Sequence, residues 1–242
     1  MNRQYDLAVV GSGPAGQKAA IQGAKLGKRV AIIDRASCVG GICIHHGAIP
    51  SKSLREAILY FTGFYHRQTY GARHYKDLTM GELMDRCAQV ESNETQTFLD
   101  QLERNRVDFI EGEASFDNEH TLVARNAEHN VEIVADVAIV AMGTAPSRPP
   151  SVSFEDGLVV DSNGLTTLKE VPKSLIVVGT GVIGTEYASM LALLRIQVTL
   201  VDQRPVILDF VDQEIAEALT YHIRDIGVVL HLGEEVISTE KA

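Results

Sequence analysis

The sequence lacks any long hydrophobic run, and this absence argues against a membrane-spanning helix. No stretch reaches the roughly 18 uncharged apolar residues that such a helix needs. The amino terminus passes from Asp6 directly into a short apolar run, without the hydrophobic region of a secretory signal peptide. A cytoplasmic location with no membrane partner is therefore the default expectation.

Positive charge and cysteine are also scarce. The 22 Lys and Arg stand against 32 Asp and Glu, which gives a net charge of −10 and argues against nucleic acid as a partner. Three cysteines in 242 residues are too few for a secreted disulfide scaffold, and their odd number leaves one unpaired. The length favours one large domain or two modest ones.

Glycine, by contrast, is placed in a pattern typical of dinucleotide binding. An apolar run at 7–10 leads into a Gly-x-Gly-x-x-Gly turn at 11–16, which is followed by a predicted helix over 15–26. A second apolar run at 30–33 ends at Asp34. The glycines allow a tight turn and close approach of a pyrophosphate, the helix amino terminus offers N–H groups, and the carboxylate accepts ribose hydroxyls.

The same arrangement recurs 168 residues further along. An apolar run at 175–178 precedes a second Gly-x-Gly-x-x-Gly turn at 179–184, a helix is predicted over 183–194, and a strand at 198–201 ends at Asp202. In both copies the carboxylate stands 23 residues after the first glycine of the turn. Two dinucleotide-binding units explain this repeat better than glycine turns that bind nothing.

The material between the two units has a different character. Residues 79–106 predict one or two solvated helices packed on a core. Residues 107–116 and 121–134 predict a small antiparallel ribbon, and 137–141 predict a buried strand of the parallel type. The prolines of 146–150 indicate a domain boundary.

Residues 40–52 read Gly-Gly-Ile-Cys-Ile-His-His-Gly-Ala-Ile-Pro-Ser-Lys. This stretch resembles the class I pyridine nucleotide–disulfide oxidoreductases, whose FAD domain has Gly-Gly-x-Cys, four residues, a second Cys and Ile-Pro-Ser-Lys on one helix. The resemblance extends over essentially the whole chain and includes Ala-Met-Gly-Thr at 141–144, a variant of the family's Ala-Thr-Gly motif. It implies an α/β fold of two Rossmann-like, doubly wound units with a three-layer FAD/NAD(P)-binding architecture, the ribbon being inserted in the first.

The resemblance also implies a division into domains. Residues 1–145 would form an incomplete first segment of the FAD-binding domain, and 146–242 an NAD(P)-binding domain truncated at its carboxyl end. Family chains are about twice as long and form homodimers through an interface domain that is absent here. The sequence leaves open whether the chain is a fragment, whether it retains FAD and what its oligomeric state is. An exposed apolar face is expected where the further segments would pack.

One departure from the family decides the expected chemistry. Cys43 falls on the first cysteine of the family's redox pair, but Ala48 occupies the position of the second. Without that thiol the relay of electrons to a disulfide substrate is lost. The soluble pyridine nucleotide transhydrogenase branch has the same departure and continues with Leu-Arg-Glu-Ala, as 54–57 do. The resemblance therefore implies ping-pong hydride transfer between NADH or NADPH and NADP or NAD through FAD, without a redox disulfide.

The resemblance assigns roles to individual residues. Lys52 and Glu186 are the candidate catalytic residues, expected to form an ion pair beside the flavin and the nicotinamide. The candidate FAD contacts are Gly11, Ser12, Gly13, Pro14, Ala15, Gly16, Asp34, Arg35, Gly41, Cys43, Lys52, Gly143 and Thr144. The candidate contacts of NAD or NADP are Gly179, Gly181, Ile183, Gly184, Glu186, Asp202 and Arg204.

Several alternatives stay open. Asp202 suits the free 2′-hydroxyl of NAD and repels the 2′-phosphate of NADP, whereas Arg204 can pair with that phosphate. A flavin diaphorase or NAD(P)H oxidase, or a truncated inactive dinucleotide-binding module, are the other functions to consider. Cys38 is also separated from Cys43 by four residues, although it precedes the expected helix. No metal site is expected, because the adjacent histidines at 45–46 point apart on a helix.

Overall fold

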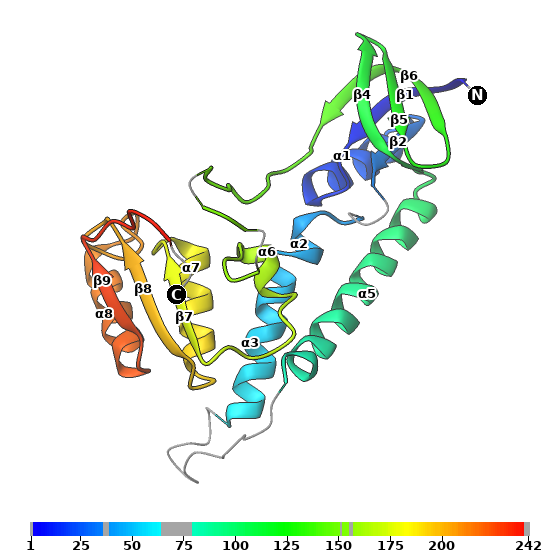
Figure 1. Ribbon diagram of the computed structural model, residues 1–242. Coiled ribbons are helices and arrows are strands. Elements are labelled where there is room, and N and C mark those ends of the chain that lie inside the picture. Colours follow the sequence, from blue (N-terminus) through cyan, green and yellow to red (C-terminus); the bar gives the residue numbers. More distant parts are fainter. Residues whose placement is uncertain (1, 36–38, 64–78, 151, 155–156, 240–242) are drawn as a thin grey trace. The chain divides into compact units, whose positions relative to one another are not determined.

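The computed structural model describes residues 2–35, 39–63, 79–150, 152–154 and 157–239, which divide into two compact units (Figure 1). The first unit comprises Met1–Pro50 and Cys87–Ala145, and the second comprises Ser51–Arg86 and Pro146–Ala242. The segment Ser51–Arg86, which the resemblance assigns to the FAD domain, is grouped here with the second unit. Which unit binds which cofactor stays a prediction.

The first unit is built on a six-stranded sheet of order β3-β2-β1-β6-β5-β4 (Figure 1). The pairs β2–β3, β1–β2 and β1–β6 are parallel, whereas β4, β5 and β6 pair antiparallel. The strands are β1 (Asn2–Val10), β2 (Val30–Asp34), β3 (Asp108–Glu111), β4 (Glu113–Asn118), β5 (Thr121–Arg125) and β6 (Asn130–Val140).

The expected antiparallel ribbon exists, but two of its predicted boundaries are wrong. Residues 108–111 form β3 in the parallel part of the sheet, so only β4 of the first predicted arm belongs to the ribbon. The second arm divides into β5 and β6, because the Asn126 side chain accepts hydrogen bonds from the N–H groups of Glu128 and His129 and closes a turn. Strand β6 then continues without a break to Val140. Its residues 130–134 pair with β5, and its residues 132–140 pair with β1 on the other side.

Alternate side chains of β1 and β2 build the core on opposite faces of this sheet. Val9 and Ile32 pack with Phe98 and Leu102 of α5 (Met80–Arg104) and with Ala20 of α1 (Pro14–Lys25). On the other face, a cluster containing the neighbouring β1 and β2 residues packs with the ribbon, and its members are Tyr5, Ala8, Ala31, Ile33, Ile110, Leu122, Ala124, Ile133 and Ala135. Helix α1 therefore lies where the sequence predicts it.

The long stretch after residue 79 forms one helix. Helix α5 begins with a reciprocal cap, in which the Glu82 N–H donates to Thr79 Oγ1 and the Thr79 N–H donates to the Glu82 carboxylate. The single helix expected around Cys43 is wrong, because α2 (Ile42–His45) ends before α3 (Ala48–Thr62) begins. Among the described residues, no helix has the length and apolarity needed to cross a membrane.

In the second unit, strands and helices alternate from β7 to β9, as the predicted fold requires. The three strands form a parallel sheet of order β7-β8-β9 (Figure 1). Within the described ranges β7 pairs only with β8, and its Ile176 and Val178 side chains are exposed. Val137 and Val140 of β6 are exposed as well. The elements are α6 (Ser162–Leu165), β7 (Ser174–Val178), α7 (Val182–Ala192), β8 (Gln197–Asp202), α8 (Gln213–Asp225) and β9 (Val229–Leu232).

Candidate dinucleotide-binding sites

The first glycine turn joins β1 to α1 in a geometry that requires glycine at two positions. Gly11 has φ +100°, and a Cβ there would lie 2.2 Å from the Ala141 carbonyl oxygen. A Cβ on Gly16 would lie 1.9 Å from the Gly11 carbonyl oxygen. A Cβ on Gly13 would meet nothing nearer than 4.0 Å, and no side chain caps the start of α1. The open side of the turn thus presents backbone N–H groups to an anion.

Ser12 connects this turn to Asp34 and to the next loop. Its N–H and hydroxyl donate to one Asp34 carboxylate oxygen at 2.7 and 2.6 Å, and its oxygen accepts from the Gly40 N–H at 3.0 Å. The Arg35 N–H donates to the other Asp34 oxygen at 2.8 Å. Gly41 has φ +66°, and its Cβ would lie 2.7 Å from the Cα of Gly13. The structure therefore brings these predicted FAD residues together around one turn.

The second glycine turn joins β7 to α7 in the same way. Gly179 has φ +107°, and a Cβ on Gly184 would lie 2.0 Å from the Gly179 carbonyl oxygen. A Cβ on Gly179 or Gly181 would meet no heavy atom within 4 Å, and α7 has no side-chain cap. The turn leaves room where a pyrophosphate would approach the helix amino terminus.

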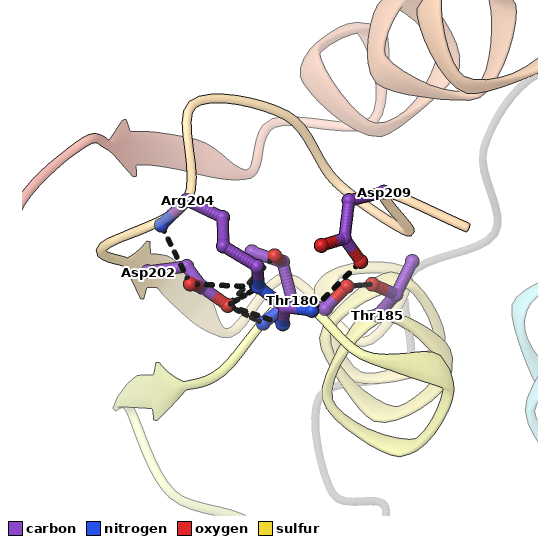
Figure 2. A network of polar contacts seen from close by, with 5 residues as sticks. All are labelled: Thr180, Thr185, Asp202, Arg204 and Asp209. Atoms are coloured by element: carbon purple, nitrogen blue, oxygen red, sulfur yellow. Dashed lines mark hydrogen bonds and ion pairs between the residues drawn. The ribbon is translucent and has the colours of Figure 1, made fainter. Parts of the chain in front are cut away.

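Asp202, at the end of β8, is the centre of a polar network (Figure 2). The Thr180 N–H and hydroxyl donate to Asp202 Oδ2 at 2.6 and 2.8 Å, and the Arg204 N–H donates to Oδ1 at 2.8 Å. The Arg204 guanidinium donates to Oδ2 through Nη2 at 2.7 Å and reaches Asp209 Oδ1 through Nη1 at 3.0 Å. The bonds from Arg204 are the main reason that the pKa of the buried Asp202 carboxyl lies far below its ordinary value.

A hollow of about 480 Å³ adjoins this network, within the usual size range of ligand sites. Its far wall is the segment after β9, which is anchored by hydrogen bonds from the Gly233 N–H to the Arg204 carbonyl and from the Glu234 N–H to the Asp202 carbonyl. The residues that line it are Val178, Gly179, Val201, Asp202, Gln203, Arg204, Glu234, Glu235 and Val236. The hollow lies beside the second glycine turn, where the adenosine of a dinucleotide would sit.

The two candidate catalytic residues are not joined in this structure. Lys52 lies on α3 with an exposed side chain, and Glu186 lies on α7 and is half-buried. No ion pair between them occurs in the part of the chain that the structure describes. Their pairing beside a flavin stays a prediction.

The remaining predicted contacts lie near the two turns or at the ends of neighbouring elements. Pro14 and Ala15 are exposed at the start of α1, and Ile183 is exposed on the first turn of α7. Gly143, with φ +69°, and Thr144 follow β6 and are exposed.

No disulfide occurs between cysteines that the structure describes. Cys43 is half-buried on α2 and is a free thiol, and Cys38 lies outside the described residues. The Cys87 thiol donates to the Pro50 carbonyl oxygen at 3.6 Å. Burial raises the pKa of the Cys87 thiol, which makes it a poor nucleophile at neutral pH.

Two contacts in the structure were not predicted from the sequence. His45 pairs through Nδ1 with Glu91 of α5 and through Nε2 with the Val39 carbonyl oxygen at 2.9 Å, so it connects α2 to α5. Asp209 reaches Arg204 from the loop after β8. An arginine flanked by two acidic residues is the only sequence signal for the second contact. No group of three or more potential metal ligands occurs among the described residues.

Several known proteins are similar to this chain over most of its length. A family model described as pyridine nucleotide-disulphide oxidoreductase matches residues 5–242. The protein named soluble pyridine nucleotide transhydrogenase in Mycobacterium bovis is 47% identical over 242 residues, covering 98% of this chain and 52% of the relative. Its namesake in Colwellia psychrerythraea is 36% identical over 240 residues, with 98% and 52% covered.

Solved structures give the same fold. The copper(II) complex of the HOCl-induced flavoprotein disulfide reductase RclA from Escherichia coli superposes with a TM-score of 0.82 at 30% identity, covering 98% of this chain and 51% of that one. This chain therefore spans about half the length of the relatives that it matches. FAD and NAD(P) are the cofactors of these flavoprotein oxidoreductases, and both glycine turns have the open backbone cradle that such dinucleotides require. The chain belongs to the pyridine nucleotide-disulphide oxidoreductase family.

Proposed function

We propose that this chain acts within an FAD-dependent transhydrogenase that transfers a hydride between NADH or NADPH and NADP or NAD. The observation that carries the proposal is the doubled turn, since each copy has a backbone cradle and a carboxylate at the end of the next strand. When bound, FAD would supply the site that accepts a hydride from one nicotinamide and returns it to another. The transhydrogenase names of the relatives support this reading.

In this proposal the first unit binds FAD and the second binds the nicotinamide dinucleotides in turn. Gly13 and the amino terminus of α1 would receive the FAD pyrophosphate, and Asp34 would receive a ribose hydroxyl. Gly181 and Asp202 would do the same for NAD or NADP. Both turns are held by internal hydrogen bonds, so little rearrangement of the backbone is required on binding.

Lys52 and Glu186 would act beside the reacting rings. Both are charged residues on helices, α3 and α7, and Glu186 is half-buried. We propose that they pair when the cofactors are bound, which would orient the nicotinamide and place a positive charge near the flavin.

A transhydrogenase differs from a disulfide reductase in having no second thiol. Ala48, the first residue of α3, stands where the family has that cysteine, and Cys43 is a free thiol. We therefore expect Ala48→Cys to create a long-wavelength charge-transfer band on reduction of the flavin, because a thiolate would then face it. The wild type and the matched control Ala48→Ser are expected to show no such band in absorbance spectra. Absence of the band in Ala48→Cys would mean that residue 48 is not in the second cysteine's register.

Stopped-flow absorbance tests the proposal as a whole. The purified flavin-containing chain is mixed with NADH until the flavin bleaches, and then with NADP or its thio analogue under anaerobic conditions. Reoxidation of the flavin by NADP is the expected result. Reoxidation only by a quinone or oxygen would favour a diaphorase or oxidase, and purification without flavin would favour an inactive binding module. A cytoplasmic location and homodimerisation of the whole protein stay predictions.

A further inference from the structure

Arg204 is held between two carboxylates of the second unit (Figure 2). Its Nη2 lies 2.7 Å from Asp202 Oδ2, and its Nη1 lies 3.0 Å from Asp209 Oδ1. The Asp202 side chain is 6% exposed, whereas the side chains of Arg204 and Asp209 are 35% and 46% exposed. The guanidinium therefore bridges a buried carboxylate and an accessible one.

Asp202 does not depend on the guanidinium for its hydrogen bonds. It also accepts the Thr180 N–H, the Thr180 hydroxyl and the Arg204 N–H. These three bonds would satisfy a buried carboxylate if the guanidinium moved away.

The backbone at Arg204 is fixed while its side chain is accessible. The Arg204 N–H donates to Asp202, and its carbonyl oxygen accepts from the Gly233 N–H at 3.1 Å. The guanidinium can thus leave the two carboxylates by rotation of the side chain alone. Its departure would break the charge-assisted bond from Nη1 to Asp209.

Arg204 and Asp202 both line the hollow of the second unit, and Arg204 is the one cation among the described residues that line it. Glu234 and Glu235 add negative charge to the wall. A 2′-phosphate entering this hollow would meet repulsion from the carboxylates unless the guanidinium turned toward it, whereas a free 2′-hydroxyl needs only an acceptor.

We propose that Asp209 is a positioning residue that holds Arg204 on Asp202 and thereby favours dinucleotides with a free 2′-hydroxyl, and that Arg204 turns to the 2′-phosphate when NADP binds. The inference rests on the proposed function in one respect, namely that the hollow receives the adenosine of NAD or NADP. It adds the device by which one site would accept both dinucleotides.

Binding of two adenosine nucleotides tests the proposal without any redox reaction. We would titrate the full chain by calorimetry with 5′-AMP and with adenosine 2′,5′-bisphosphate, which differ only in the 2′-phosphate. Asp209→Asn should tighten binding of the bisphosphate about threefold to tenfold, because a neutral amide holds the guanidinium less strongly than a carboxylate does. Binding of 5′-AMP should change less than about twofold, since Asp202 keeps its other bonds.

Three further variants make the test specific. Arg204→Gln should weaken binding of the bisphosphate about tenfold or more and 5′-AMP much less. Asp209→Glu should preserve the wild-type ratio of the two dissociation constants. Glu235→Gln is the matched control, because it removes one negative charge from the same hollow without a hydrogen bond to Arg204 in the described structure. Thermal unfolding of each variant identifies any loss of binding caused by misfolding.

A wild-type ratio in Asp209→Asn, or an equal shift in Glu235→Gln, would overturn the positioning role. A purely structural role for Asp209 would change both dissociation constants together. If the folded wild type bound neither nucleotide, the assignment of the hollow in the proposed function would fail, and the inference with it. If the wild type bound both and Arg204→Gln left their ratio unchanged, only the inference would fail.

Discussion

The two glycine turns have nearly the same backbone conformation and the same hydrogen bonds. Their first glycines have φ +100° and +107°, and the Cβ that each third glycine lacks would lie 1.9 and 2.0 Å from the carbonyl of the first. Ser12 and Thr180 each donate an N–H and a hydroxyl to the carboxylate at the end of the next strand. The repeat in sequence is therefore a repeat of individual hydrogen bonds.

The surroundings of the turns differ. In the first unit the Ser12 oxygen also accepts the Gly40 N–H, and a Cβ on Gly11 would strike the Ala141 carbonyl. In the second unit a Cβ on Gly179 would meet open space, and Asp202 is bound by a guanidinium that a second carboxylate shares. The first turn is held by the backbone around it, and the second by an ion pair. In the proposed function, the first turn would hold a cofactor that stays bound, and the ion pair of the second could exchange partners with a substrate that binds and leaves.

Substitution of the third glycine of either turn should have the largest effect on stability. Gly16→Ala and Gly184→Ala should each lower the free energy of unfolding by more than about 2 kcal/mol, because the new methyl group would overlap a backbone carbonyl that cannot move away. Urea unfolding of each variant measures the loss. Gly13→Ala and Gly181→Ala are matched controls that should keep stability and lose dinucleotide binding, since their Cβ atoms enter the open side of the turn. A stable Gly184→Ala protein would show that the second turn can relax.

Removal of the Ser12 and Thr180 hydroxyls tests the difference between the surroundings of the two turns. Ser12→Ala should lower the free energy of unfolding by about 2–3 kcal/mol, because it removes a bond to Asp34 and leaves the buried Gly40 N–H without its acceptor. Thr180→Val should cost about 1–2 kcal/mol, because its hydroxyl donates to Asp202 alone. Parallel urea unfolding of both variants tests the order, and a larger loss in Thr180→Val would contradict it.

The smallest effect expected is that of pH on the ion pair of the second turn. The guanidinium lowers the pKa of Asp202 below its ordinary 3.8, so the native state binds fewer protons there than the unfolded chain. The stabilisation is complete above 3.8 and is lost as the pH falls through the lower pKa of the folded state. The stability difference between wild type and Asp202→Asn should therefore be equal at pH 8 and pH 5 and should shrink below about pH 3.8. A difference that already changed between pH 8 and pH 5 would mean that another group controls it.

Much of both sites was predictable because their determinants are local. A tight turn between a strand and a helix needs glycine where φ is positive or where a backbone carbonyl lies close. The positions of Gly11, Gly16 and Gly184 could therefore be predicted from the sequence pattern. The carboxylates at the ends of the second strands follow from a fixed strand and helix length. Residue 48 could likewise be compared with the family's second cysteine by counting alone.

Other features were mispredicted because they depend on pairing at a distance. The sequence predicts two segments where β6 is one strand. Its residues 132–140 all lie in the pairing range with β1, and 130–134 also pair with β5, so one neighbouring strand spans both predicted segments. The sequence predicts residues 108–111 as part of the ribbon. The pattern of apolar and polar side chains indicates a strand, but this pattern does not tell which neighbouring strand it pairs with. The interruption between α2 and α3 depends on how the backbone at Gly47 folds back toward Ile42.

The sequence by itself determined the two glycine turns, their carboxylates and the alanine at position 48. The turns and residue 48 are set by neighbours in the chain, and the carboxylates by the regular lengths of the helix and strand that follow each turn. Only the tertiary structure decided that Asp209 reaches Arg204 and that His45 reaches Glu91, 46 residues away. Such contacts depend on where a loop or a helix packs after its own local structure has formed. The glycines thus define the two open turns at which we propose that dinucleotides bind, and the packing around Arg204 defines the contact by which we propose that the second unit chooses between two of them.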